Sequence, residues 1–199
     1  MVQHLVREMN ELDTPDAPPV GRRNFLEQDV VDRVIEAATD PDLKFILHCG
    51  FSAGLRRNEI SEARVEWFDL NRRVVHVYSS DNGDFVTKDK SYRVVPLKKA
   101  FLEFLKTYLA NRNPAEYVLA PTKVKGKATY RYDPNKRVRS HFTKCKVRST
   151  WHDMRRSFAS NLISRGESVY IVSSWLGDLV AVVERSYGFL APSAGNIDR

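Results

Sequence analysis

The fold class depends on residues 72–97, which read RRVVHVYSSDNGDFVTKDKSYRVVPL. RRVVHVY, DFVT and SYRVVPL are short strand-type runs, and the polar stretches DNGD and KDKS between them are typical of tight turns. This pattern predicts a small antiparallel sheet of three strands. The amphipathic run KKAFLEFLKTYLANR (98–112) follows directly and predicts a long helix.

Helix signals dominate the rest of the chain. Asn24, with Glu27 three residues later, predicts one helix start, and Asp40-Pro41 predicts the start of a second, apolar helix. Towards the carboxyl end, the sequence predicts two or three helices separated at Gly166 and Gly177. We therefore expect an α+β, mainly helical domain, with the small sheet on a helical core.

Composition indicates a globular chain with one core. Its 199 residues are 42% hydrophobic and 29% charged. No stretch approaches the roughly 20 apolar residues that span a bilayer, so no membrane partner is expected. Cys49 and Cys145 fit neither a disulfide framework nor a zinc-binding pattern. We expect a reducing, cytoplasmic setting and neither a metal nor another cofactor.

The amino-terminal part reads differently from the rest. The segment DTPDAPPVGRR (13–23) is rich in proline and aspartate and has no hydrophobic period. It predicts that residues 1–23 form a linker or amino-terminal arm and that residues 24–199 form the domain. On this interpretation the chain is the carboxyl-terminal piece of a longer protein.

Charge is distributed unevenly along the chain, whose net charge is +7. Residues 1–42 carry ten acidic and four basic residues, whereas residues 121–150 carry ten basic residues and one acidic residue. Such asymmetry predicts an extended polyanion as partner, most simply nucleic acid, although a solvated basic surface is the alternative. The candidate phosphate contacts are Lys123, Lys125, Lys127, Arg131, Lys136, Arg137, Arg139, Lys144, Lys146 and Arg148.

Two candidate sites lie in the first half of the chain. In AGLRRNE, Arg56 and Glu59 are three residues apart and would share a helix face, either as a functional pair or as a surface ion pair. Lys88 lies in the predicted turn VTKDKSYRVVP. There it could deliver a proton or a point charge into a groove, or simply be an exposed lysine.

Two further candidates lie in the second half. In HDMRRSFASNLISRG, His152 and Arg155 share a predicted helix face and suit an anionic oxygen, although a capping histidine beside a surface arginine is the alternative. In WLGDLVAVVERSYG, Tyr187 is either a reactive phenol or a packed aromatic at helical spacing.

Taken in order, AGLRxxE, TKxxxxRVVPL, HxxR and LGx(9)Y make the chain resemble the catalytic domain of the tyrosine recombinases, the integrases of phages and mobile elements. The resemblance runs from about residue 25 to residue 190. Lys88 lies eight residues before Pro96, which matches the family's hairpin lysine, and Tyr187 matches its nucleophile. The implied fold is a helical catalytic domain with a small three-stranded antiparallel sheet, without the amino-terminal core-binding domain that the family usually has.

The resemblance implies a site-specific recombinase that cleaves and rejoins DNA strands through a 3′-phosphotyrosyl intermediate, with neither metal nor ATP. Tyr187 would be the nucleophile, and Arg56 and Arg155 would bind the non-bridging phosphate oxygens. Lys88 would be the general acid for the departing 5′-oxygen. His152 would hydrogen-bond the phosphate or accept the tyrosine proton. The carboxylate of Glu59 would orient its neighbours.

Asp178 departs from the family pattern, which usually has a histidine or a tryptophan after LG. An ionised carboxylate cannot donate a hydrogen bond to a phosphate and would repel it. Asp178 could be protonated, turned away to pair with an arginine, or a sign of reduced activity. We favour the pairing, because Arg56, Arg155 and Arg185 offer partners.

The implied partner is a double-stranded DNA attachment site, with a tetramer on DNA and a monomer or weak oligomer without it. A type IB topoisomerase shares this chemistry, but the LGx(9)Y spacing and the RVVPL strand favour a recombinase. An inactive DNA-binding module of the same fold is an alternative that Asp178 suggests. A basic structural or RNA-binding protein would leave the ordered motifs unexplained.

Overall fold

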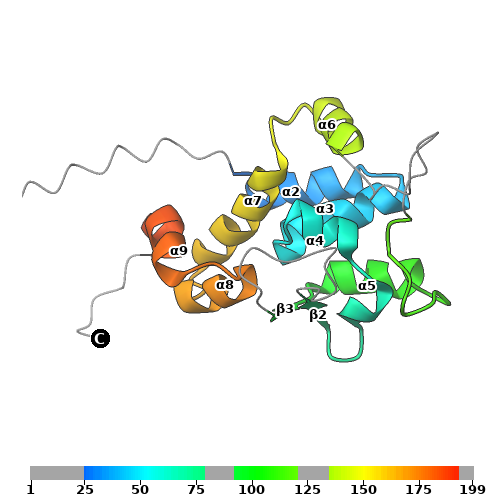
Figure 1. Ribbon diagram of the computed structural model, residues 1–199. Coiled ribbons are helices and arrows are strands. Elements are labelled where there is room, and N and C mark those ends of the chain that lie inside the picture. Colours follow the sequence, from blue (N-terminus) through cyan, green and yellow to red (C-terminus); the bar gives the residue numbers. More distant parts are fainter. Residues whose placement is uncertain (1–24, 79–91, 121–134, 193–199) are drawn as a thin grey trace, which may run out of the picture.

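A computed structural model describes residues 25–78, 92–120 and 135–192 (Figure 1). The α-helices within these ranges are α2 (Gln28–Glu36), α3 (Pro41–Ala53), α4 (Arg57–Glu62), α5 (Lys99–Tyr108), α6 (Asn135–Lys144), α7 (Trp151–Ile163), α8 (Val169–Leu176) and α9 (Val180–Tyr187). The strands are β1 (Phe68–Asp69), β2 (Val74–Val77) and β3 (Arg93–Pro96). Short 3₁₀ turns lie at η1 (Val65–Trp67) and η2 (Gly188–Leu190). The predicted α+β, mainly helical fold with a small antiparallel sheet is confirmed.

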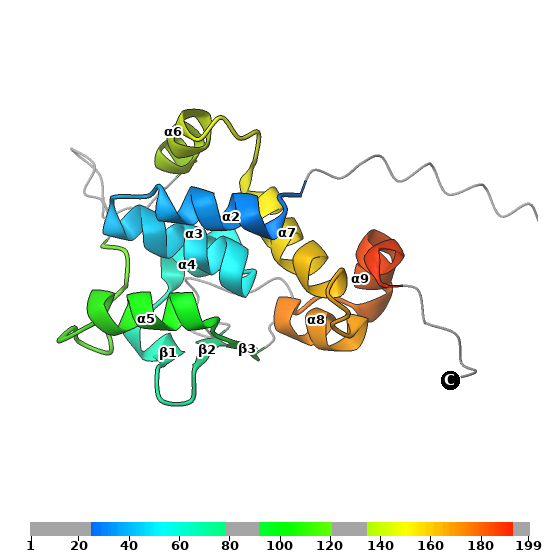
Figure 2. The ribbon, with the colours of Figure 1, turned by 180° about the vertical axis from the view of Figure 1, so that it is seen from behind.

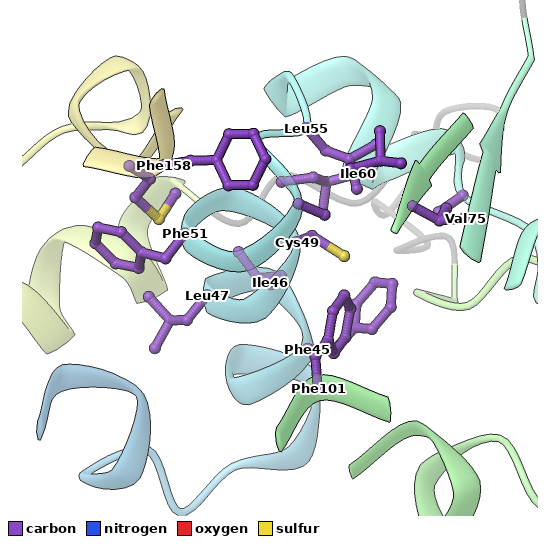
Figure 3. Packing of buried hydrophobic residues seen from close by; sticks show 14 of the residues in the cluster. Phe45, Ile46, Leu47, Cys49, Phe51, Leu55, Ile60, Val75, Phe101 and Phe158 are labelled. Atoms are coloured by element: carbon purple, nitrogen blue, oxygen red, sulfur yellow. The ribbon is translucent and has the colours of Figure 1, made fainter. Parts of the chain in front are cut away.

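Helix α3 forms the centre of the core. Every residue from Phe45 to Ala53 is buried, and a helix that is buried all round needs neighbours on all its faces. Accordingly, α3 packs against α2, α4, α5, α6 and α7. Figure 3 shows Phe45 of α3 near Phe101. The rings of Phe45 and Phe101 lie 6.4 Å apart, centroid to centroid.

The predicted start of α3 is confirmed and that of α2 is not. The Asp40 side chain accepts a hydrogen bond from the Leu43 amide at 2.8 Å, with Pro41 in the first turn. Helix α2 begins at Gln28, with Glu27 in the capping position. Residues 25–27 are not helical because the amide of Leu26 donates to Ser157 Oγ and its carbonyl accepts from Asn161, both on α7. Sequence-local signals do not report such long-range bonds.

The sheet contains two of the predicted strands and one that was not predicted. Strand β2 pairs with both β1 and β3, antiparallel in each case. The outer strand β1, residues 68–69, comes before the segment that predicted the sheet. The predicted strand DFVT lies at 84–87, outside the described residues. In both views the sheet lies beside α5 (Figures 1 and 2).

The carboxyl-terminal helices follow the predicted breaks. Gly166 lies between α7 and α8 and Gly177 lies between α8 and α9, both with positive φ, a conformation that glycine adopts without strain. Helices α8 and α9 pack on each other and on α7. No helix in the described ranges is long and apolar enough to cross a membrane.

Candidate active site

Arg56 is placed by the turn between α3 and α4. Gly54 ends α3 with φ of 63°, which reverses the chain so that Arg56 occupies the capping position of α4. The Arg56 amide donates to Glu59 Oε2 at 2.7 Å, and its Nη1 donates to Glu59 Oε1 at 3.1 Å. The predicted proximity of Arg56 and Glu59 is therefore observed, and the carboxylate directs the guanidinium.

Arg155 reaches the same place from α7. Its Nη1 donates to the Gly54 carbonyl at 2.5 Å, and its Nη2 donates to the Leu176 carbonyl at 2.6 Å. Burial lowers the pKa of this guanidinium, and the charge of Asp178 acts in the opposite direction. These bonds tie α7 to the ends of α3 and α8 and leave little freedom to the side chain.

The carboxylate of Asp178 lies between the two arginines. Its Oδ1 accepts from Arg56 Nη2 at 2.7 Å, and its Oδ2 accepts from Arg155 Nη2 at 2.7 Å. Sequence reasoning expected pairing with an arginine, with the carboxylate turned away from the phosphate position. The pairing is observed, with both Arg56 and Arg155, but the carboxylate lies between the two guanidinium groups and is not turned away from them.

Arg93 is a residue of this site that sequence reasoning missed. Its Nη1 and Nη2 donate to Glu59 Oε1 and Oε2 at 2.8 and 2.6 Å, and its Nε donates to the Trp175 carbonyl at 2.8 Å. Arg93 is 5% exposed and Glu59 is 1% exposed. The signal was strand alternation, because Arg93 shares a face of β3 with the buried Val95.

Glu59 is ionised inside the protein for a definite reason. Burial alone raises the pKa of its carboxyl group. Hydrogen bonds and charge from Arg93, and then from Arg56, outweigh that effect and hold the pKa below its ordinary value. Glu59 is therefore shared between Arg93 and Arg56, and Asp178 contacts Arg56 and Arg155, so the three guanidinium groups carry one more charge than the two carboxylates.

Of the other candidate catalytic residues, the structure describes His152 and Tyr187. His152 is exposed in the first turn of α7 and makes no hydrogen bond to the described residues. Tyr187 is half-buried at the end of α9, and its ring packs on the hydrophobic core. Lys88 lies outside the described residues. The structure thus brings together Arg56, Glu59, Arg155 and Asp178, and it does not bring His152 into their hydrogen-bond network.

The basic segment is described in part. The described cations on α6 and just after it are all exposed, namely Lys136, Arg137, Arg139, Lys144, Lys146 and Arg148. Val138, His141 and Phe142 form the buried face of α6, so the charges face solvent. A shallow groove of about 330 Å³ between α3 and α6 is lined by three of these cations. Arg137 also pairs with Asp40, and this carboxylate offsets the positive charge that Arg137 would present to a partner. Lys123, Lys125, Lys127 and Arg131 lie outside the described residues.

The arrangement suits an anion with two accessible oxygens. Two guanidinium groups from distant parts of the chain converge on two carboxylate oxygens, and planar guanidinium forks also match phosphate oxygens.

Among residues 25–78, 92–120 and 135–192, no group of three His, Cys, Asp or Glu side chains could hold a metal ion.

Comparison with known proteins identifies the family. The model of the phage integrase family matches residues 24–177, more than half of the chain. The match ends one residue before Asp178 and does not include Tyr187. The chain is 26% identical over 173 residues to tyrosine recombinase XerA of Pyrococcus horikoshii, covering 85% of this chain and 58% of that protein. It is 24% identical over 184 residues to the integrase of Salmonella phage P22, covering 88% of this chain and 46% of that protein.

Solved structures agree on the fold. A crystal structure of XerA recombinase matches with a TM-score of 0.66 and 22% identity, covering 83% of this chain and 60% of that chain. The catalytic domain of bacteriophage HP1 integrase matches with a TM-score of 0.60 and 18% identity, covering 85% of this chain and 89% of that chain. The chain spans about half the length of the curated relatives it matches. It belongs to the phage integrase family and has the fold of a tyrosine recombinase catalytic domain.

Proposed function

We propose that the chain is the catalytic domain of a site-specific DNA recombinase that cleaves and rejoins strands through Tyr187. The observation that carries the proposal is the convergence of Arg56 and Arg155 on one two-oxygen anion, the Asp178 carboxylate. Family membership supplies the reaction class, and the arginine pair supplies the site at which a phosphodiester could bind.

The reaction needs no net input of bond energy. The Tyr187 oxygen forms a bond to phosphorus while the bond from phosphorus to the 5′-oxygen breaks, which gives a 3′-phosphotyrosyl link and a 5′-hydroxyl. A second strand's 5′-hydroxyl then reverses these steps and releases the tyrosine. Arg56 and Arg155 stabilise the charge that develops on the phosphoryl oxygens, which is the main demand of phosphoryl transfer.

Proton transfer falls to residues outside the arginine pair. Lys88 is the proposed general acid that delivers a proton to the departing 5′-oxygen. His152 is exposed and lies one turn before Arg155 on α7, and it is the proposed residue that accepts the Tyr187 proton or hydrogen-bonds the phosphate. Glu59 acts through Arg56, whose guanidinium and amide it holds.

The partner under this proposal is double-stranded DNA. A structural neighbour, the Tn1549 transposon integrase, was solved in complex with transposon right end DNA, with a TM-score of 0.59 and 15% identity. The exposed cations of α6 would contact phosphates, so binding should weaken steeply with salt. Assembly as a tetramer on DNA is part of the same proposal.

A second candidate is a DNA-binding module without cleavage activity. The observation that favours it is again Asp178, since its carboxylate lies where the arginines would bind a phosphate. Cleavage assays separate the two candidates because only the enzyme forms a covalent bond to DNA.

The test uses nicked duplexes randomised around the nick, because the attachment sequence is an unknown. A nick beside the cleavage site lets the short product diffuse away and traps the covalent complex. Adducts that survive denaturation would be recovered from the unaltered chain, from Tyr187→Phe and from Tyr170→Phe. Tyr170 is a matched control, because it is an exposed tyrosine on the neighbouring helix α8.

Adducts from the unaltered chain and from Tyr170→Phe, with none from Tyr187→Phe, would support the enzyme. Binding without an adduct would support the inactive module. Adducts that persist in Tyr187→Phe would refute the assignment of the nucleophile.

A further inference from the structure

The arginine pair is already occupied by an anion that belongs to the chain. Each oxygen of Asp178 accepts one hydrogen bond, Oδ1 from Arg56 and Oδ2 from Arg155, both at 2.7 Å. A phosphate with two non-bridging oxygens would make the same two contacts. Asp178 is the carboxylate that contacts both members of the pair, whereas Glu59 is shared between Arg93 and Arg56.

The Asp178 side chain can leave without dismantling the site. Arg56 Nη2 also bonds the Gly177 carbonyl at 3.2 Å, and Arg155 Nη2 also bonds the Leu176 carbonyl. These backbone bonds hold both guanidinium groups in place whatever the carboxylate does. The Asp178 side chain is 28% exposed, so a path to solvent is open to it.

We infer that Asp178 is an internal competitor for the phosphate position, which holds the arginine pair in a self-paired state until an outside anion displaces it. The inference rests on the proposed function for the identity of that anion, a DNA phosphate. It assigns Asp178 a regulatory role at a position where the family pattern has a hydrogen-bond donor.

Competition of this kind has a measurable size. The apparent affinity for an outside anion falls by the fraction of molecules in which the position is open. If the carboxylate occupies the pair in about nine molecules of ten, its removal strengthens anion binding about tenfold, within the usual range for coupled sites. Asp178→Asn keeps the shape of the side chain and removes its charge, so it is the sharpest variant.

The experiment is a sulfate titration of the whole chain, followed by the NMR signals of the Gly177 amide and of the arginine Nε groups. Sulfate tests the arginine pair without any need for DNA cleavage. The variants are Asp178→Asn and, in case the first perturbs the fold, Asp178→Ser, with circular dichroism as the check. Glu184→Gln is the matched control, since it removes one negative charge from an exposed position on the next helix.

We expect both Asp178 variants to bind sulfate at these signals about tenfold more tightly, with Glu184→Gln within twofold of the unaltered chain. Equal affinity in the Asp178 variants and the unaltered chain would overturn the inference. An equal gain in Glu184→Gln would overturn it too, because general charge would then explain the effect. If the chain forms no Tyr187 adduct but shows the expected sulfate result, the proposed function is refuted and the inference that Asp178 competes with an outside anion stands.

Discussion

Replacing Arg93 by methionine should strongly destabilise the protein, because it leaves the Glu59 carboxylate buried with one cation in place of two. The side chains of Arg93 and Glu59 are 4% and 1% exposed. Removal of one partner from such a buried pair typically costs 3–5 kcal/mol in the free energy of unfolding. Arg56 still donates to Glu59, so we expect a loss near the lower end, about 3 kcal/mol.

The stability lost in Arg93→Met should depend on pH in a definite direction. In the unaltered chain the pKa of Glu59 is lowered from 4.5, so its ionised form contributes stability above that pH. That contribution is lost as the pH falls through the lowered pKa. In Arg93→Met the larger of the two cation effects on Glu59 is gone, and burial raises the pKa of the Glu59 carboxyl group. Acidification therefore lowers the free energy of unfolding of the variant less than that of the unaltered chain. The stability difference should therefore narrow between about pH 7 and about pH 3.5.

Urea denaturation followed by circular dichroism at the two pH values measures this difference. Lys106→Met is the control, since it breaks an exposed pair with Glu103 and should leave the midpoint unchanged. Adding Glu59→Gln to Arg93→Met should recover about 1 kcal/mol, because it removes a buried charge that only Arg56 would still contact. A loss below about 1 kcal/mol, or a difference that stays constant with pH, would refute the account of this pair.

Three other measurements test separate parts of the structure. Gly177→Ala should lower the free energy of unfolding by about 1–2 kcal/mol, because φ is 65° there and a Cβ would lie 3.1 Å from Arg93 Cδ. The urea denaturation midpoint of the variant measures this loss. Burial lowers the pKa of His48 from 6.5 to about 4, so stability should fall by about 3 kcal/mol as the pH drops through that interval; His48→Phe should remove this dependence in pH-resolved unfolding. Asp40→Ala removes the cap of α3 and should cost about 1 kcal/mol, whereas an unchanged urea midpoint would contradict the capping role.

Much of the fold could be predicted because its signals are local. The cap at Asp40, the breaks at Gly166 and Gly177 and the strand alternation before Leu97 each depend on a few neighbouring residues. The start of α2 could not be predicted, because its position depends on hydrogen bonds from Leu26 to α7. The short strand β1 was missed for a similar reason, because two residues carry almost no period.

The candidate site divides in the same way. Sequence order and spacing singled out Arg56, Glu59 and Arg155, and the structure brings these side chains together. The role of Arg93 was visible in principle as an arginine on the buried face of a strand. Its partner was not, since Glu59 lies on a different element and is reached only by tertiary packing.

By itself the sequence determined the helical character of the chain, the sheet segment, the uneven charge and the residue types able to bind a phosphate. Those properties arise from neighbours along the chain, so no three-dimensional information was needed. The sequence favoured an arginine partner for Asp178, and only the tertiary structure decided that both Arg56 and Arg155 bind it. Its carboxylate lies between Arg56 and Arg155 because the ends of α3, α7 and α8 meet there, and such long-range Coulomb contacts leave no trace in local spacing.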